Sequence, residues 1–572
     1  MTEARKNSVC AESTSSIGSF QFGLDAILVR IGVFGKFQLF NYLLICIPML
    51  FRGIFIESYI FLASSVVYRC RVPECDGPNS TYQEPWTEFS IPTTSSGDLS
   101  DCLRYVPFNR SSVQDFCFAQ NFDQSTKERC GMDFIFRDKE VTISNDFGIY
   151  CSDEWKLSMV GTVHNLGKFI GIPLGGYVSD RYGRRTILAV GGFLSAIVGV
   201  IRSFSMNYYM FLSLGFLDNV FSGTLYATIF ILGLELVGQK ARVLSCTLLT
   251  VFTVFGKVSL AIAAKMYPNW RTILQIFYTP ALAHIILLWI LPESVRWLLS
   301  QGEEVKAAQI LQKAAHVNKR KLSDLTIERL LVDNRQKLSE EKSTFPIRQC
   351  FKALFWRIFN CALCWFTHVL VYYGLSLNSI SLGGNKYDNF MLMSLIEIPG
   401  LVMPFWTMDR FGRRYSLFGC LIVCGICLSA TILVESNVYG LQLALFLIGK
   451  LSITASFQVL YFFTSEIFPT NVRNSLLSFC SMFGRIGSMV APQTPLMAKY
   501  FQSGPAILFS ACAFISAFIA LSFPETTDAI LPTTMHEAED IGQKRKHIDS
   551  ENNSIPHQEH KIYSVSFSSS SS

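Results

Sequence analysis

The chain has 572 residues, of which 50% are hydrophobic and only 16% are charged, and its formal net charge is +6. A soluble domain keeps roughly a quarter of its residues charged, so this composition excludes an ordinary soluble globular protein. The charged residues are concentrated between long apolar segments, as in proteins whose helices face lipid. The basic residues gather in alternate loops, which favours a positive-inside membrane protein over a protein that binds nucleic acid.

Twelve segments are apolar over the roughly 20 residues that a helix needs to cross a bilayer. In chain order they are 39–63, 156–178, 187–204, 208–234, 244–265, 272–291, 356–380, 389–408, 416–434, 440–463, 475–497 and 505–523. Residues 1–38 are polar and mixed, and we expect a cytoplasmic segment there rather than a signal peptide. The pattern predicts an all-α membrane protein.

The segment 64–155, between the first two spans, is rich in cysteine. It holds Cys70, Cys75, Cys102, Cys117, Cys130 and Cys151, together with two glycosylation acceptors, Asn79 and Asn109. An even set of cysteines beside acceptor sites indicates an oxidising, extracellular loop. Six cysteines allow 15 pairings, so the connectivity stays open. With this loop outside, the arginine-rich loops and both termini are predicted to be cytoplasmic.

Three motifs recur in the second half of the chain at offsets of 229, 231 and 232 residues. The pairs are Asp180-Arg-Tyr-Gly-Arg-Arg185 with Asp409-Arg-Phe-Gly-Arg-Arg414, Glu235 and Arg242 with Glu466 and Arg473, and Pro292-Glu293 with Pro524-Glu525. Such spacing predicts two parallel six-helix halves, 39–291 and 356–523, joined by a charged cytoplasmic linker, 292–355. Parallel halves with a site at their interface are a known transporter plan. The tail, 524–572, is predicted to be disordered and cytoplasmic.

The loop Gly176-x-x-x-Asp-Arg-x-Gly-Arg-Arg185 resembles the signature of the major facilitator superfamily. The cysteine-rich first loop, Pro292-Glu-Ser-Val-Arg-Trp-Leu298, Tyr372-Tyr-Gly-Leu-Ser-Leu-Asn378 and Glu466-Ile-Phe-Pro-Thr-Asn-Val-Arg-Asn474 are similar to the organic cation, anion and zwitterion solute carriers. The sequences of these motifs most resemble those of insect organic cation transporter-like proteins. The resemblance implies a twelve-helix major facilitator fold and alternating access.

This sequence departs from the family at several positions. Leu214 and Asp218 stand where the fourth span often carries arginine and then glycine, and Lys257 stands where an apolar residue is usual. A basic residue at the position of Arg485 goes, in the resembling family, with carriers of anions or zwitterions. These departures put the substrate of any one relative in doubt for this chain.

Charged residues within a span cost roughly 2.5–3.5 kcal/mol on insertion scales and usually face a cavity or the bundle interior. The candidates are Lys168, Asp218, Lys257, Glu397, Lys450 and Arg485. Arg485, supported by Lys450, is predicted to grip a substrate carboxylate through its planar fork, the alternative being an ion pair with Glu397. Asp218 is predicted either to pair with Lys257 or to hold a substrate ammonium.

Aromatic residues in the seventh and tenth spans can stack on a quaternary ammonium. The candidates are Trp365, Phe366, Tyr372, Tyr373 and Tyr461, although most of the 48 Phe and 21 Tyr are expected only to pack or face lipid.

The repeated loops are predicted to brace one state of the carrier, as a gate. The residues are Asp180, Arg181, Arg184, Arg185, Glu235 and Arg242 in the first half, and Asp409, Arg410, Arg413, Arg414, Glu466 and Arg473 in the second. A solvated positive-inside loop explains the arginines alone but not the repeated aspartates and glycines.

The sequence therefore predicts a plasma-membrane carrier of small organic cations or zwitterions, such as carnitine-like or amino-acid-derived amines. An organic-anion or sugar-like carrier, and a non-transporting solute sensor on a carrier scaffold, are the alternatives. An enzyme is not expected, because the chain has no nucleophile elbow, phosphate loop or metal-ligand cluster. The expected partners are a small organic solute and the lipid bilayer, without nucleic acid, cofactor or metal.

Overall fold

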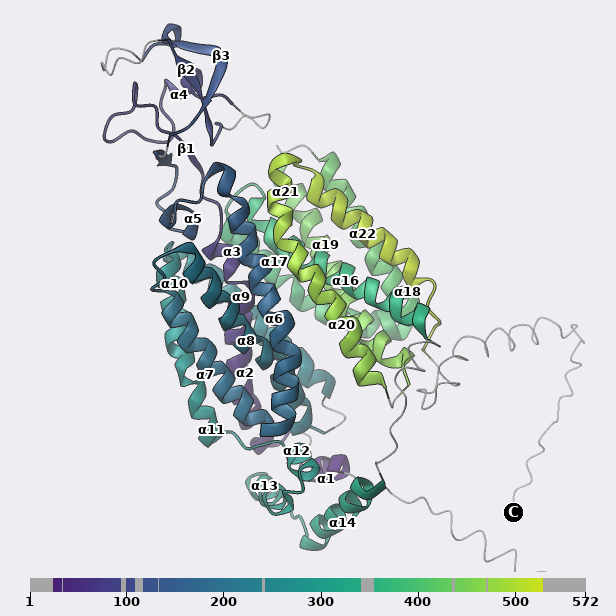
Figure 1. Ribbon diagram of the computed structural model, residues 1–572. Helices are drawn as coiled ribbons and strands as arrows, with labels where there is room; N and C mark the ends of the chain where they lie inside the picture. Colours follow the sequence, from purple (N-terminus) through teal and green to yellow (C-terminus); the bar gives the residue numbers. More distant parts are fainter. Residues whose placement is uncertain are drawn as a thin grey trace, which may run out of the picture.

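The computed structural model describes residues 24–32, 34–93, 99–108, 117–131, 133–238, 242–340, 354–434, 438–469 and 472–527. Two bundles of long helices lie side by side (Figure 1). A small domain with strands β1 (Tyr68–Cys70), β2 (Leu103–Pro107), β3 (Phe122–Arg129) and β4 (Phe134–Phe136) stands beyond one end, which we call the disulfide end. The short helices α12 (Val295–Ser300), α13 (Glu304–Val317) and α14 (Asp324–Glu340) lie beyond the opposite end, which we call the linker end.

The first bundle contains the helices before the linker. They are α2 (Lys36–Glu57), α3 (Tyr59–Leu62), α6 (Trp155–Tyr182), α7 (Arg184–Arg202), α8 (Tyr208–Leu236), α9 (Arg242–Met266), α10 (Trp270–Ala281), η5 (Leu282–Ile286) and α11 (Leu287–Ile290). α6 and α7 pack on α8, and α2 packs on α9. Asn207 and Asn269 begin α8 and α10, where their side chains accept the backbone N–H of Met210 and Arg271. Asparagine is favoured at such N-caps because it satisfies an otherwise unpaired donor.

The second bundle begins after the linker. It consists of α16 (Phe355–Asn378), η6 (Ser379–Ser381), α17 (Lys386–Leu395), α18 (Glu397–Leu433), α19 (Tyr439–Ile467), α20 (Arg473–Val490), η7 (Ala491–Gln493), α21 (Thr494–Tyr500) and α22 (Gly504–Ala520). α18 packs along α19 and α22, and α16 packs along α20. Each bundle thereby buries the apolar sides of its own helices.

Eight helices within the described residues are long and apolar enough to cross a membrane. One of them runs from Lys386 to Leu433, and its 48 residues are long enough for two crossings. It bends at Gly412, where the backbone has φ 81°. α6, α20 and α22 coincide with predicted spans but fall outside the eight, since α22 is short and α6 and α20 carry polar residues. The all-α membrane fold is confirmed, and the count of twelve spans stays a prediction.

The N-terminal helix α1 (Leu24–Ile31) lies against the linker helices. Asn318, at the end of α13, accepts the backbone N–H of Phe37 at 2.9 Å and donates to the carbonyl of Ile31 and the side chain of Gln38. Arg296 of α12 pairs with Asp25. Helix α1 and the beginning of α2 are thus fastened to the linker.

In the domain at the disulfide end, two small antiparallel sheets, β1–β4 and β2–β3, are held by three disulfides. The six cysteines pair as Cys70–Cys130, Cys75–Cys117 and Cys102–Cys151. Several crossed loops are tied in this way, which suits a domain too small to build a large apolar core. Asn79 lies exposed on its surface.

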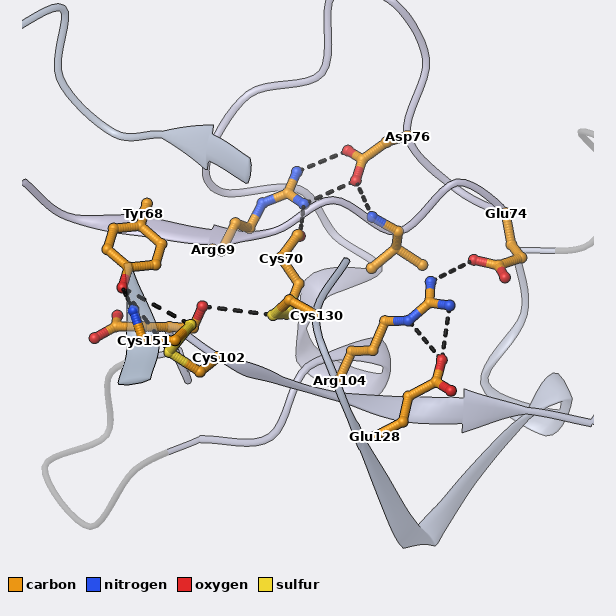
Figure 2. Close-up of a disulfide and its surroundings, with 12 residues drawn as sticks. Tyr68, Arg69, Cys70, Glu74, Asp76, Cys102, Arg104, Glu128, Cys130 and Cys151 are labelled. Atoms are coloured by element: carbon orange, nitrogen blue, oxygen red, sulfur yellow. Dashed lines mark hydrogen bonds and ion pairs between the residues drawn. A yellow bond between two sulfur atoms is a disulfide. The ribbon is translucent and has the colours of Figure 1, made fainter. Parts of the chain in front are cut away.

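A buried arginine organises this domain beside the disulfides (Figure 2). The Arg69 side chain is 0% exposed and forms a two-pronged ion pair with Asp76, at 2.8 and 2.9 Å. Its remaining donors bond the backbone carbonyls of Cys70, Thr81 and Tyr82. All five guanidinium donors therefore have acceptors, which a buried charge requires.

Replacing Arg69 with methionine is expected to destabilise this domain by about 3–5 kcal/mol, because Asp76 would stay buried without its partner. The matched control is Arg71→Met, since Arg71 makes one long bond, 3.4 Å, to the carbonyl of Gly77. Surface labelling and trypsin resistance of the two tagged variants measure the effect. Equal surface amounts for both variants would contradict this role of Arg69.

Candidate substrate site

A cavity of about 320 Å³ lies between the two bundles, a volume within the usual range for small-molecule sites. Both bundles contribute to its wall. Its charged and aromatic lining consists of Arg52, Glu57, Tyr226, Phe230, Lys257, Tyr372, Tyr373, Glu397, Phe405, Phe457, Tyr461, Phe462 and Arg485. The cavity is lined by the predicted substrate residues Lys257, Tyr372, Glu397, Tyr461 and Arg485.

A network of buried charges joins the two bundles in the wall of this cavity. Lys257 of α9 lies 3.0 Å from Glu57 of α2 and 2.9 Å from Glu397 of α18. Its ammonium also donates to the Tyr372 hydroxyl at 2.8 Å. Lys450 of α19 lies 3.1 Å from the same Glu397 carboxylate. Two acids and two lysines therefore balance one another across the interface between the halves.

Two arginines in the lining stand apart from that network. Among the described residues, neither Arg52 nor Arg485 has a carboxylate within ion-pair distance, and no hydrogen bond joins either to another side chain. Arg52 lies over the ring of Tyr226, with 3.9 Å from its guanidinium carbon to the ring centroid. The predicted alternative for Arg485, a pair with Glu397, does not form, because that carboxylate is held by Lys257 and Lys450.

A small side pocket extends the positive side of the cavity. Arg52, Lys168 and Arg485 all line it. The Lys168 ammonium donates to the backbone carbonyl of Ile56 at 2.9 Å, which is a neutral acceptor. Three basic side chains thus converge here without a described carboxylate, whereas the acids of the cavity already face lysines. The formal side-chain charge of the lining is positive.

Asp218 is a correction to the sequence prediction. It is 0% exposed and does not line the cavity. Ser195 of α7 and Tyr278 of α10 each donate to its carboxylate at 2.6 Å, and Arg202 lies 3.9 Å away. Because α8 turns this side chain toward α7 and α10, it meets neither Lys257 nor a solute in the cavity. Both predicted roles of Asp218, the pair with Lys257 and the ammonium site, are therefore wrong for this structure.

Two further candidates support the wall without lining it. Trp365 donates from its indole to Thr464 at 3.1 Å and packs edge-on against Phe457 and Tyr461. Lys450 is 0% exposed and forms an ion pair with Glu397. Trp365 thus packs against two lining residues, Phe457 and Tyr461, while Tyr372 and Tyr461 line the cavity themselves.

Among the lining residues that the sequence analysis did not single out are Arg52, Glu57 and Tyr226. The first two lie inside the predicted span 39–63, so the rule that charges within a span face a cavity already covered them. Tyr226 carried no such signal among the many aromatic residues of the chain.

The repeated loops at the linker end share one arrangement of glycine and glutamate. Glu293 accepts the backbone N–H of Arg184 and Arg185, at 2.9 and 3.0 Å, where α7 begins. Glu525 accepts those of Arg413 and Arg414, at 2.9 and 3.1 Å, in the second half. A carboxylate suits a helix N-terminus, whose N–H groups are unpaired and carry partial positive charge.

The glycine in each of these loops makes room for that carboxylate. Gly183 and Gly412 have φ of 99° and 81°, which side chains rarely adopt. A Cβ atom on Gly183 would lie 2.3 Å from Glu293 Oε2, and one on Gly412 would lie 2.8 Å from Glu525 Oε2. The repetition of the Pro-Glu motif in the sequence does not by itself predict this capping role.

The predicted gating residues mostly bond within their own half. Arg184 lies 2.8 Å from Asp180 and 3.8 Å from Glu235, and Arg413 lies 3.2 Å from Glu466. Arg473 donates to the backbone carbonyl of Phe468. The others are exposed or half-buried beside neighbouring rings or solvent, namely Arg181, Arg185, Asp409, Arg410 and Arg414. The side chain of Arg242 and the acceptor Asn109 lie outside the described residues.

Contacts between the halves gather at the disulfide end. Thr162 of α6 bonds Gln493 and the carbonyl of Met489. Lys265 lies 2.7 Å from Asp388. Lining residues such as Leu234 and Cys246, by contrast, lie close to the linker ends of α8 and α9. The cavity is therefore closed toward the disulfide end and extends toward the linker end.

The chain is similar in sequence and fold to known carriers. Residues 107–532 match the family described as sugar (and other) transporter. Solute carrier family 22 member 7 of Sus scrofa is 30% identical over 90% of this chain and 96% of that protein. Solute carrier family 22 member 3 of Mus musculus is 29% identical, covering 91% and 97%. The organic cation transporter protein of Drosophila melanogaster is 28% identical, covering 91% and 95%.

Among solved structures, the inward open conformation of the xylose transporter XylE from E. coli superimposes with a TM-score of 0.55 at 17% identity, covering 70% of this chain and 93% of that one. This likeness confirms the major facilitator fold. The family resemblance seen in the repeated motifs is confirmed as well. The chain is therefore a member of the sugar (and other) transporter family, in solute carrier family 22 of the major facilitator superfamily, and a multi-pass membrane transporter of organic solutes.

Proposed function

We propose that this protein carries small organic anions, and after them zwitterions, across the plasma membrane by alternating access between its two halves. The observation that supports this most is the pair Arg52 and Arg485, which line the cavity without a described carboxylate partner. Guanidinium groups bind carboxylates through two parallel hydrogen bonds. A substrate carboxylate would supply the missing partner.

Electrostatics argue against a plain organic cation as the main substrate. The acids Glu57 and Glu397 already face Lys257 at 3.0 and 2.9 Å, whereas Arg52 and Arg485 are uncompensated. In a partly desolvated cavity, like charges repel and opposite charges attract far more strongly than in water. The Drosophila relative is named for organic cations, but the cavity of this chain is lined by more positive than negative side chains.

Zwitterions are the second candidate because the cavity also offers features that an ammonium favours. Rings of Tyr372, Tyr461 and Phe457 form part of its wall. An ammonium gains from such rings by cation–π attraction of roughly 0.5–2 kcal/mol.

The orientation we propose places the disulfide end outside the cell and the linker end in the cytoplasm. Disulfides form in oxidising compartments, and arginine-rich loops favour the cytoplasmic side. The cavity then extends inward in this conformation, and the repeated loops act as the gate that closes it in the opposite conformation. An anion entering against an inside-negative potential costs about 2.3 kcal/mol per 100 mV, so accumulation inside the cell requires exchange or ion coupling.

Uptake of three solutes with the same aromatic skeleton tests this proposal. 3-Phenylpropanoate carries only a carboxylate, phenylalanine carries both charges, and 2-phenylethylammonium carries only the cation. We expect uptake above vector-transfected cells in that order, with the cation at background. Preferred uptake of 2-phenylethylammonium would contradict the proposal. Binding of the anion without flux by surface-expressed protein would instead favour a sensor.

Asn79 provides a test of the orientation. It lies exposed on the disulfide domain, so Asn79→Gln is expected to lose one glycan and to migrate faster in an electrophoresis gel. Wild type treated with an N-glycosidase is the control. Both proteins are made in animal cells. If Asn79→Gln migrates like wild type, and if the N-glycosidase does not change the mobility of wild type, the assignment of glycosylation at this side would be wrong.

A further inference from the structure

We infer that Lys257 is a resident cation that fills an ammonium site formed by Glu57, Glu397 and Tyr372, and that its charge keeps cationic solutes out of the cavity. The inference deepens the proposed function, since it names the residue that would set the charge of the substrate. It concerns the acidic side of the cavity, opposite in charge to the side formed by Arg52 and Arg485.

The surroundings of the Lys257 ammonium have the composition of a site for a ligand amine. One carboxylate oxygen of Glu57 lies 3.0 Å away, and the two oxygens of Glu397 lie 2.9 and 3.1 Å away. The Tyr372 hydroxyl accepts a bond at 2.8 Å. An ammonium has three donors and no acceptor, so these oxygens satisfy it fully.

The Tyr372 ring borders the site, with its hydroxyl toward Lys257, and the Lys450 nitrogen lies 3.4 Å from its centroid. The Lys257 nitrogen lies 5.0 Å from the centroid of the Tyr372 ring. Carboxylates combined with an aromatic ring within about 6 Å are the features by which proteins hold ligand cations. The groups come from both bundles, Glu57 from α2 and the other two from α18 and α16. The site therefore lies at the interface that alternating access must rearrange.

The second lysine of the network also contacts Glu397 and the Tyr372 ring, but it does not line the cavity. Lys450 is 0% exposed and absent from the cavity lining, whereas Lys257 lines the cavity. Lys450 bonds Ser376 at 2.8 Å and the backbone carbonyl of Tyr372 at 3.0 Å in addition to Glu397. Removing the Lys257 amine would open space toward the cavity and leave Glu57 without a cation, while Lys450 would still hold Glu397 in place.

The position of Lys257 on the chain agrees with this role. The amine is borne by α9, while one of its carboxylates belongs to α18 in the other half. A charge within a span costs free energy on insertion, and Glu57 and Glu397 offset that cost here. A free solute cation would have to displace the Lys257 ammonium. This ammonium is covalently attached to the protein and is therefore held at high effective concentration.

The test measures exchange of labelled 2-phenylethylammonium by purified wild type and Lys257→Ala in liposomes. We expect the variant to exchange this cation at least tenfold faster than wild type. Lys257→Arg keeps the charge and is expected to exchange far less of this cation than Lys257→Ala. The double variant Lys257→Ala with Glu57→Gln is expected to lose most of the gain, because one carboxylate of the site is neutral.

A binding readout separates this inference from the proposed function. Ethylammonium, which is small enough to replace the lost side-chain amine, is expected to raise the thermal unfolding temperature of Lys257→Ala and not that of wild type. Failure of wild type to exchange 3-phenylpropanoate would overturn the proposed function but leave this readout intact. A variant that ethylammonium does not stabilise, and that exchanges no cation, would overturn the role of Lys257.

Discussion

Replacing Arg485 with alanine is expected to lower the uptake of 3-phenylpropanoate by about 10–100-fold. Each hydrogen bond to a charged group contributes roughly 1.5–3 kcal/mol, and every 1.4 kcal/mol is about a factor of ten in affinity. Arg485 lines both the cavity and its positive side pocket. Concentration-dependent uptake at matched surface amounts measures the loss, which is expected in affinity for the carboxylated solute.

Two variants make this result specific. Arg485→Lys keeps the charge without the planar fork, and we expect it to recover part of the affinity. Arg329→Ala removes an exposed arginine from α14, far from the cavity, and is expected to leave uptake unchanged. If Arg485→Ala impairs neutral, cationic and anionic solutes equally, the residue stabilises the bundle and does not bind the carboxylate.

Replacing Glu293 with alanine is expected to lower the stability of the carrier by about 2–5 kcal/mol, because a buried carboxylate that holds several donors is lost. The backbone N–H groups of Arg184, Arg185 and Ser294 would lose their acceptor. Thermal unfolding of the purified protein in detergent measures the effect. Glu293→Gln keeps an acceptor oxygen without the charge and is expected to lose less.

The repeat supplies a matched variant in the other half. Glu525 caps the second half in the same way, and Glu525→Ala is expected to have a similar effect. Burial raises the pKa of Glu525, but hydrogen bonds from Thr527 and from the backbone of Arg413 outweigh it and hold the pKa below 4.5. Its contribution is therefore present above pH 4.5 and lost as the pH falls through the lowered pKa. If both alanine variants unfold at the same temperature as wild type, the capping role is contradicted.

The sequence predicted the fold well because its signals are periodic and repeated. The apolar segments mark the helices, and the common offset of the motifs marks the two halves. It also placed Lys257, Glu397 and Arg485 among the cavity residues, because a charge in a span must face the interior. That argument depends only on the cost of burying charge, which can be judged from residue positions alone.

The partners of those charges could not be predicted, because they depend on how each helix is rotated against its neighbours. Asp218 was expected to meet Lys257, yet α8 turns it toward Ser195 and Tyr278. The disulfide connectivity depends likewise on the path of the loops, which spacing does not determine. The role of Glu293 lay within a repeated motif but required the backbone geometry of Gly183 to be recognised.

The charge of the solute is the central claim, and counterflow in liposomes that contain only the purified carrier tests it most directly. Vesicles are loaded with unlabelled 3-phenylpropanoate or unlabelled 2-phenylethylammonium, and entry of the same labelled solute is followed without a membrane potential. We expect transient accumulation of the labelled carboxylate and none of the labelled cation. Accumulation of the cation, with the carboxylate at the level of empty vesicles, would contradict the account.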